Sequence, residues 1–260
     1  MATIHGFGDS FTEGQPDDLD FKPFNEWKIF RGGNLPPSWL ELLGEKMSMD
    51  IKVTARGGNS NNQIFDNVCS HSDEFKKGDI VIINWTYRHR FRWASTQKHE
   101  NGEPSYVWRP LSSNDTQPQD DWYIKKELRH EIISNQLQTP YLDEIYSREK
   151  IIEQLSKSIG FEIYFWSADD SIIYDLPNEK LNQKKYILHN IIDKKAPGQL
   201  GYFFNTIKKY GGQTISEETN NVIWDIHLGE SGHRAQFELF YEYINNYNTT
   251  NSNEGRLPNA

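Results

Sequence analysis

The sequence contains a single cysteine, Cys69, among its 260 residues. An intrachain disulfide and a zinc site built from cysteines are therefore both excluded. Cys69 lies in a stretch where apolar residues recur at helical spacing, so we expect a buried apolar side chain rather than a reactive thiol.

The chain also lacks any stretch that approaches the roughly 18 consecutive apolar residues of a membrane-spanning helix. No basic segment followed by an apolar segment precedes the first predicted strand, which begins almost at Met1. We therefore expect no signal peptide and no membrane span. The corresponding expectation is a cytoplasmic protein that leaves the cell only by lysis or as part of a particle.

Basic residues are fewer than acidic ones: the chain has 28 lysines and arginines and 37 aspartates and glutamates, which gives a formal net charge of −9. Such a chain offers no basic surface for a phosphate backbone, so nucleic acid is not an expected partner. Binding to an anionic membrane is disfavoured for the same reason.

Aromatic residues, by contrast, are abundant, with 8 Trp, 13 Tyr and 14 Phe against an apolar fraction of only 36%. This balance indicates a core of ordinary size plus aromatic surface in loops. The length suits one domain, which we place at residues 1–247. The tail at 248–260 is rich in Asn, Thr and Ser, and we expect it to be flexible.

Short apolar runs alternate with segments of helical spacing along most of the chain. This order predicts parallel strands joined by right-handed crossovers, in a three-layer α/β/α domain with a mostly parallel sheet of about five strands. The predicted strands are 3–7, 51–55, 79–83, 161–166 and 221–225, with 201–210 either a strand or a helix. One predicted helix begins after Ser38, which would cap it. Further helices are predicted at 60–75, 121–138, 142–159, 178–191 and 232–247.

One serine follows the first predicted strand in a turn of small residues. A strand that ends at Gly8 would place Ser10 at the carboxyl edge of the sheet, where open α/β sheets carry their chemistry. A serine becomes a nucleophile only beside a base, and the sequence Asp225-Ile226-His227 offers one near the other end. His227 would be the base and Asp225 its orienting carboxylate. Backbone amides at Ser10 and Gly58, with a polar side chain after the third strand, would form the oxyanion hole.

Each of these residues also has a purely structural interpretation. Ser10 could cap the following helix, and Asp225 and His227 could be a structural pair in a turn. Metal ligation by His227, His233 and Asp225 is a weaker alternative, because no further ligand cluster is evident. We expect no metal and no organic cofactor.

Three other polar residues near these motifs are expected to support the fold. We expect His5, inside the first strand, to be a core histidine with a hydrogen-bond partner. Asp9 is expected to fix its loop as a hydrogen-bond acceptor rather than to act as a second base. His233 is expected to support the last helix.

The two end motifs resemble those of a known family. Gly8-Asp9-Ser10-Phe11 with Gly14 resembles the first block of the SGNH (GDSL-type) hydrolases, and the segment 225–233 resembles their last block. The resemblance covers essentially the whole chain. It implies a flavodoxin-like α/β fold and activity as an esterase, lipase, thioesterase or carbohydrate deacetylase.

The sequence departs from the family pattern at three places. One residue rather than two separates Asp225 from His227. The second glycine turn offers Gly58 as oxyanion donor, with Gly57 as the alternative. The third block is degenerate, so the resemblance assigns the last donor to Asn84, with Thr86 as the alternative.

The third crossover is enlarged by an insertion, residues 85–158, in which cations and aromatic rings interleave. Rings and cations together suit a glycan or acyl-substituted saccharide, so Trp85, Arg88 and Trp93 are the expected substrate contacts. The same composition also fits an oligomer or partner interface, or a loop that packs on itself.

These observations together predict a serine ester hydrolase that acts on small acyl esters, with O-acetyl groups on carbohydrate as the favoured substrate. The alternative is a protein of the same fold with weak or no turnover, such as a glycan-binding or structural component of a larger particle. The expected partners are an ester substrate and, in the second case, further subunits.

Overall fold

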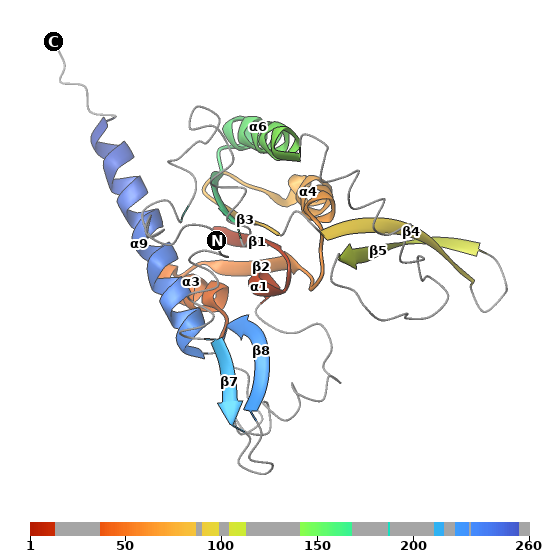
Figure 1. The fold of residues 1–260 in the computed structure, drawn as a ribbon. Coiled ribbons are helices and arrows are strands. Elements are labelled where there is room, and N and C mark those ends of the chain that lie inside the picture. The colour runs from red at the N-terminus through yellow and green to blue at the C-terminus, as the bar shows by residue number, and fades with distance from the viewer. Residues whose placement is uncertain are drawn as a thin grey trace.

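The computed structural model describes residues 1–13, 37–86, 90–98, 104–112, 141–167, 187, 211–215, 222–228 and 230–254. Within these ranges it is a mixed α/β structure built around a four-stranded parallel sheet (Figure 1). The strand order is β2-β1-β3-β6. The strands are β1 (Thr3–Gly8), β2 (Asp50–Ala55), β3 (Ile80–Trp85) and β6 (Glu162–Ser167).

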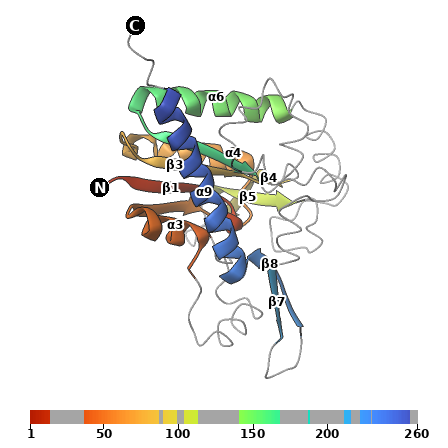
Figure 2. The same ribbon diagram turned by 90° about the vertical axis from the view of Figure 1, so that its left-hand side faces the viewer.

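Helices cover both faces of this sheet, which gives three layers (Figures 1 and 2). One face carries α3 and α9, and the other carries α4 and α6. The helices are α1 (Ser10–Glu13), α3 (Trp39–Met47), α4 (Asn61–Ser70), the 3-10 helix η1 (Ser72–Glu74), α6 (Tyr141–Ile159) and α9 (Glu230–Glu254). No helix in the described ranges is both long enough and apolar enough to cross a membrane.

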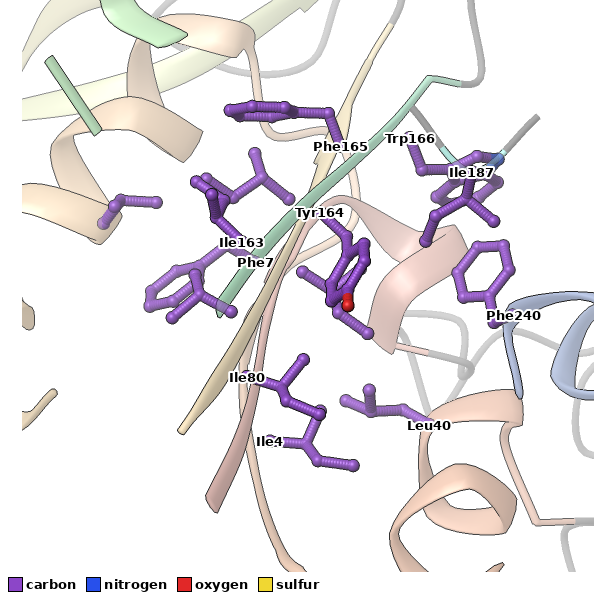
Figure 3. Packing of buried hydrophobic residues seen from close by; sticks show 14 of the residues in the cluster. Ile4, Phe7, Leu40, Ile80, Ile163, Tyr164, Phe165, Trp166, Ile187 and Phe240 are labelled. Carbon is purple, nitrogen blue, oxygen red and sulfur yellow. The ribbon is translucent and has the colours of Figure 1, made fainter. Parts of the chain in front are cut away.

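The core follows from the continuous apolar run of β3, in which all six residues are buried. A strand covered on both faces has no solvent side, so it shows no alternation of apolar and polar residues. Ile4 of β1 and Leu40 of α3 both belong to this core (Figure 3). Further along, Trp39 packs against Phe240 with ring centroids 4.6 Å apart, which joins α3 to α9.

Local capping sequences determine where two of the helices begin. Ser38 accepts a hydrogen bond from the Glu41 amide, and the Glu41 carboxylate accepts one from the Ser38 amide, so α3 starts with a reciprocal cap. Ser60 and Gln63 form the same arrangement before α4. The predicted Ser38 cap is therefore confirmed.

Several predictions about secondary structure differ from the structure. The sequence predicted no strand between 83 and 161, but β4 (Arg90–Lys98) and β5 (Pro104–Ser112) form an antiparallel pair. The strand predicted at 221–225 is β8 (Val222–Leu228), which pairs antiparallel with β7 (Gly211–Ile215) and not with the main sheet. Four parallel strands are therefore found in the described part of the chain, where about five were expected.

Two further corrections concern single elements. The last helix continues to Glu254, so part of the tail predicted to be flexible is helical. Cys69 is exposed rather than buried, because the buried face of α4 is formed by Asn61, Ile64 and Val68 instead. The elements predicted at 121–138, 178–191 and 201–210 lie outside the described residues, except that 187 is described.

Candidate active site

Ser10 lies at the carboxyl edge of the parallel sheet, where the sequence predicted it. β1 ends at Gly8, and Ser10 is the first residue of α1. The carbonyl oxygen of Asp9 accepts hydrogen bonds from the amides of Thr12 and Glu13, both at 3.0 Å, and these bonds form the turn. The Ser10 side chain is 6% exposed. Within the described residues the Ser10 hydroxyl makes no hydrogen bond that caps α1. The Asp9 carboxylate instead accepts a hydrogen bond from the Phe11 amide.

Asp9 is fully buried and accepts four hydrogen bonds through its carboxylate. Its Oδ1 atom accepts from the Phe11 amide at 3.1 Å and from Asn84 Nδ2 at 2.9 Å. Its Oδ2 atom accepts from Thr86 Oγ1 at 2.6 Å and from Arg90 at 2.7 Å. The expectation that Asp9 fixes its loop as an acceptor is confirmed.

Gly8 is packed too closely for any side chain. A Cβ atom at this position would lie 2.1 Å from Thr12 Oγ1 and 2.9 Å from the Asn84 Cβ atom. Its carbonyl oxygen also accepts a hydrogen bond from Asn59 Nδ2 at 2.9 Å. Asn59, in the second glycine turn, and Asn84, at the end of β3, therefore both contact the turn that carries Ser10.

The second glycine turn follows β2 and lies beside α1. The Gly57 amide donates a hydrogen bond to Glu13 Oε2 at 3.1 Å, so this amide already has an acceptor on α1. Gly58 has a φ of 76°, a left-handed conformation that glycine adopts without strain. Of the two glycines, Gly58 is the better candidate for an oxyanion donor because the Gly57 amide is engaged.

The two candidates for the third oxyanion donor both point toward Asp9. Asn84 is fully buried, and one of its two side-chain N–H groups donates to Asp9. Thr86 is also fully buried; its hydroxyl donates to Asp9, while its amide and carbonyl pair with the side chain of Asn61. Their shared acceptor lies next to Ser10 in the sequence, so both brace the serine turn.

The predicted substrate contacts have different outcomes. Trp85 is fully buried, donates its indole N–H to Glu149 at 2.9 Å and stacks on Phe165, so its assignment to substrate binding is wrong. Its place in the covered strand β3 explains this. Arg88 lies outside the described residues. Trp93 lies in β4, where it pairs with Arg109 of β5, and its role in substrate binding stays a prediction.

Asp225 and His227 both lie in the strand β8 and not in a turn. The strand has an irregularity at this point: Trp224 pairs with Gln213, but Leu228 pairs with Gly211. Three residues of β8 therefore stand against one of β7, which is a bulge, and bulges commonly redirect side chains next to active sites. β8 also lies against α1, the helix that begins at Ser10 (Figure 1).

The two remaining histidines near these motifs are structural. His233 is buried, and its Nδ1 atom accepts a hydrogen bond from the Trp39 amide at 3.4 Å, which links α9 to the start of α3. His5 is buried inside β1, with Nε2 lying 3.3 Å from Asp79 Oδ2. Both expectations are confirmed. Among the described residues, no group of three His, Cys, Asp or Glu side chains could hold a metal ion.

Sequence reasoning missed four polar residues that organise this edge of the sheet. Asn59 and Asn61 bind the backbones of Gly8 and Thr86, and a signal existed, because both follow the second glycine turn directly. Glu13 and Arg90 gave no such signal. Arg90 contacts Asp9 across 81 positions of the chain, and no local pattern reveals a pair of that kind.

No family model and no curated protein matches this sequence. Among solved structures, one of a carbohydrate esterase, whose active site is described as having divergent catalytic and non-catalytic binding functions, is similar at 13% identity and a TM-score of 0.39. The match covers 94% of this chain and 68% of that chain. A likeness at this level carries no conclusion about activity.

Proposed function

We propose that this protein is a serine ester hydrolase of the SGNH type, with Ser10 as nucleophile, His227 as general base and acid, and Asp225 as the orienting carboxylate. The observation that carries the proposal is the contact between α1 and β8. It brings the element that begins with Ser10 beside the strand that contains Asp225 and His227, more than two hundred positions later. The bulge at Asp225–His227 adds support, because bulges occur often where a strand presents functional side chains.

In this mechanism the Ser10 hydroxyl oxygen attacks the acyl carbon of the ester while His227 accepts the hydroxyl proton. Negative charge then develops on the former carbonyl oxygen, where the Ser10 and Gly58 amides would donate hydrogen bonds. His227 then gives the proton to the leaving alcohol. Water next attacks the acyl group on Ser10 while His227 accepts a proton from the water, and His227 returns that proton to the Ser10 oxygen as the acid product leaves. Asn84 would contribute its second N–H group, or Thr86 would take that place.

The substrate we propose is a small acyl ester, with O-acetyl groups on carbohydrate favoured. The aromatic and cationic composition of β4 and β5 supports this choice, because such side chains suit a glycan.

A comparison of the wild type with Ser10→Ala tests the activity on p-nitrophenyl acetate and on an acetylated sugar. We expect the variant to lose at least roughly 10³-fold in kcat, as losses of a catalytic serine do. Ser70→Ala, a change at an exposed serine of α4, is the matched control and should keep full activity. A fluorophosphonate probe should label the wild type and Ser70→Ala but not Ser10→Ala. Equal hydrolysis by all three proteins would refute the proposal.

A second candidate is a glycan-binding or structural protein with little turnover. The observation that favours it is that both candidates for the third donor, Asn84 and Thr86, use their side chains on Asp9. Loss of one oxyanion donor costs roughly 3–4 kcal/mol of transition-state stabilisation. Binding of an acetylated oligosaccharide without its hydrolysis, and without probe labelling, would select this candidate.

A further inference from the structure

The carboxylate of Asp9 is fully buried directly before the proposed nucleophile. Three of its hydrogen-bond donors, namely the Phe11 amide, Asn84 and Thr86, are uncharged. The fourth is the Arg90 guanidinium, whose contact at 2.7 Å is also an ion pair. A carboxylate removed from water is stable as an anion only when a cation and hydrogen bonds replace its hydration. Arg90 supplies that cation.

The same nitrogen of Arg90 also contacts Thr86, with NH1 lying 3.0 Å from Thr86 Oγ1. Because NH1 can donate to this oxygen, the Thr86 hydroxyl hydrogen is left to donate to Asp9 Oδ2 at 2.6 Å. Arg90, Thr86 and Asp9 thus form a closed triangle of hydrogen bonds. The Arg90 side chain is 15% exposed, so this triangle is largely shielded from water.

The triangle joins three parts of the fold. Asp9 belongs to the turn after β1, Thr86 follows β3, and Arg90 is the first residue of β4. The β4–β5 hairpin extends away from the main sheet (Figure 1). Its first residue is therefore fastened to the turn that carries Ser10.

We propose that Arg90 is a positioning residue for Ser10. By pairing with the Asp9 carboxylate it holds the first turn of α1 and the end of β3 in one arrangement, and it acts on catalysis through Asp9 without touching the substrate. This inference rests on the proposed ester hydrolase function. It adds that the base of the hairpin fixes the geometry of the nucleophile.

The primary test compares Arg90→Gln, Arg90→Lys and wild type in steady-state ester hydrolysis. A displaced nucleophile lowers kcat rather than substrate affinity, so we expect Arg90→Gln to lose roughly 10²-fold in kcat with KM changed by less than about twofold. Arg90→Lys keeps a cation and should recover part of the loss. Arg234→Gln, a change at an exposed arginine of α9, is the matched control and should behave as wild type.

Two further measurements separate positioning from general damage to the fold. Free guanidinium added to Arg90→Ala should restore part of kcat, because it can occupy the vacated space beside Asp9. In the double variant Asp9→Asn/Arg90→Gln both charges are removed, so its kcat should be no lower than that of Asp9→Asn alone. If Arg90→Gln fails to fold, the double variant can still be measured in its place, because it contains no buried unpaired charge.

Hydrogen exchange gives a readout that does not depend on turnover. Arg90→Gln should speed exchange at the Phe11, Thr12 and Thr86 amides, while Arg234→Gln should not. A kcat within twofold of wild type with unchanged exchange, or a loss that neither lysine nor guanidinium reduces, would overturn the inference. If wild type and Ser10→Ala hydrolyse esters equally, the proposed function fails, and the exchange result alone decides whether Arg90 holds the turn.

Discussion

The side-chain amide of Asn84 donates a hydrogen bond to Asp9 Oδ1 at 2.9 Å, inside a region where both side chains are fully buried. This contact joins the end of β3 to the residue before Ser10. The geometry of the serine turn therefore depends on the neighbouring strand as well as on its own sequence, and changes at β3 should alter both stability and activity.

Thr86→Val tests this dependence without changing the volume of the side chain. The variant loses the hydrogen bond from Thr86 Oγ1 to Asp9, and bonds to charged groups contribute about 1.5–3 kcal/mol. We expect the free energy of unfolding in urea to fall by about that amount, together with a drop in kcat. Thr54→Val, at a half-exposed site in β2, is the matched control and should change stability by less than about 0.5 kcal/mol. Equal effects of the two changes would contradict the proposed role of Thr86.

Gly8→Ala should be costly because the added Cβ atom would meet atoms that cannot move aside. Thr12 Oγ1 would lie at 2.1 Å and the Asn84 Cβ atom at 2.9 Å. We expect a loss of about 1–3 kcal/mol of stability, as for other overpacked sites, and a loss of esterase activity.

Gly44→Ala in α3 is the comparison for this change. Its added Cβ atom would lie 2.3 Å from Ile51 Cγ2 and 3.2 Å from the Met49 carbonyl oxygen, but the Ile51 side chain is 37% exposed and can rotate toward solvent. Alanine also favours the helix by about 1 kcal/mol over glycine. Thermal unfolding of both variants should therefore show the larger decrease for Gly8→Ala, and the reverse order would show that the serine turn can adjust.

The parts of this fold that could be predicted from sequence are those determined by local chemistry. The apolar run of β3 predicts a strand covered on both faces, and Ser38 with Glu41 predicts the start of α3. The need for glycine at position 8 is local in part, because a Cβ atom there would meet Thr12, four residues later. Each of these signals comes from residues within a few positions of one another.

The features that could not be predicted depend on distant residues. Charges and rings interleave along β4 and hide the alternation that would indicate a strand. The burial of Trp85 depends on Glu149, and the role of Arg90 depends on Asp9, partners that are 64 and 81 positions away. The position of His227 inside a bulged strand depends on pairing with β7, which the local sequence does not specify.

Trp85→Phe tests the correction at that residue. Phenylalanine keeps the stacking on Phe165 but cannot donate a hydrogen bond to Glu149. Since this bond ends on a carboxylate, we expect a loss of about 1.5–3 kcal/mol in the free energy of unfolding. The KM for any ester should stay unchanged, because the side chain is fully buried. A raised KM with unchanged stability would restore Trp85 as a substrate contact.

The buried histidine in β1 should make stability depend on pH. Burial lowers the pKa of His5 below its usual 6.5, against the opposing effect of the hydrogen bond and charge of Asp79. As the pH falls through about 6.5, His5 therefore takes up a proton in the unfolded chain, whereas in the folded chain it does so only at a lower pH. Below that pH the unfolded state holds more protons, so stability falls as the pH drops toward the lowered pKa, by up to about 1.4 kcal/mol per pH unit.

His5→Gln removes this titration while keeping a side chain that can hydrogen-bond to Asp79. Urea unfolding of wild type and variant at pH 7.5 and pH 5 should show a difference in stability that narrows at the lower pH, because only the wild type loses stability through this residue. Thr54→Val, at a half-exposed site in β2, changes no titratable group, so its difference in stability from the wild type should be the same at both pH values. If the difference for His5→Gln instead widened at low pH, His5 would be gaining stability from protonation beside Asp79, and burial would not be the dominant influence on its pKa.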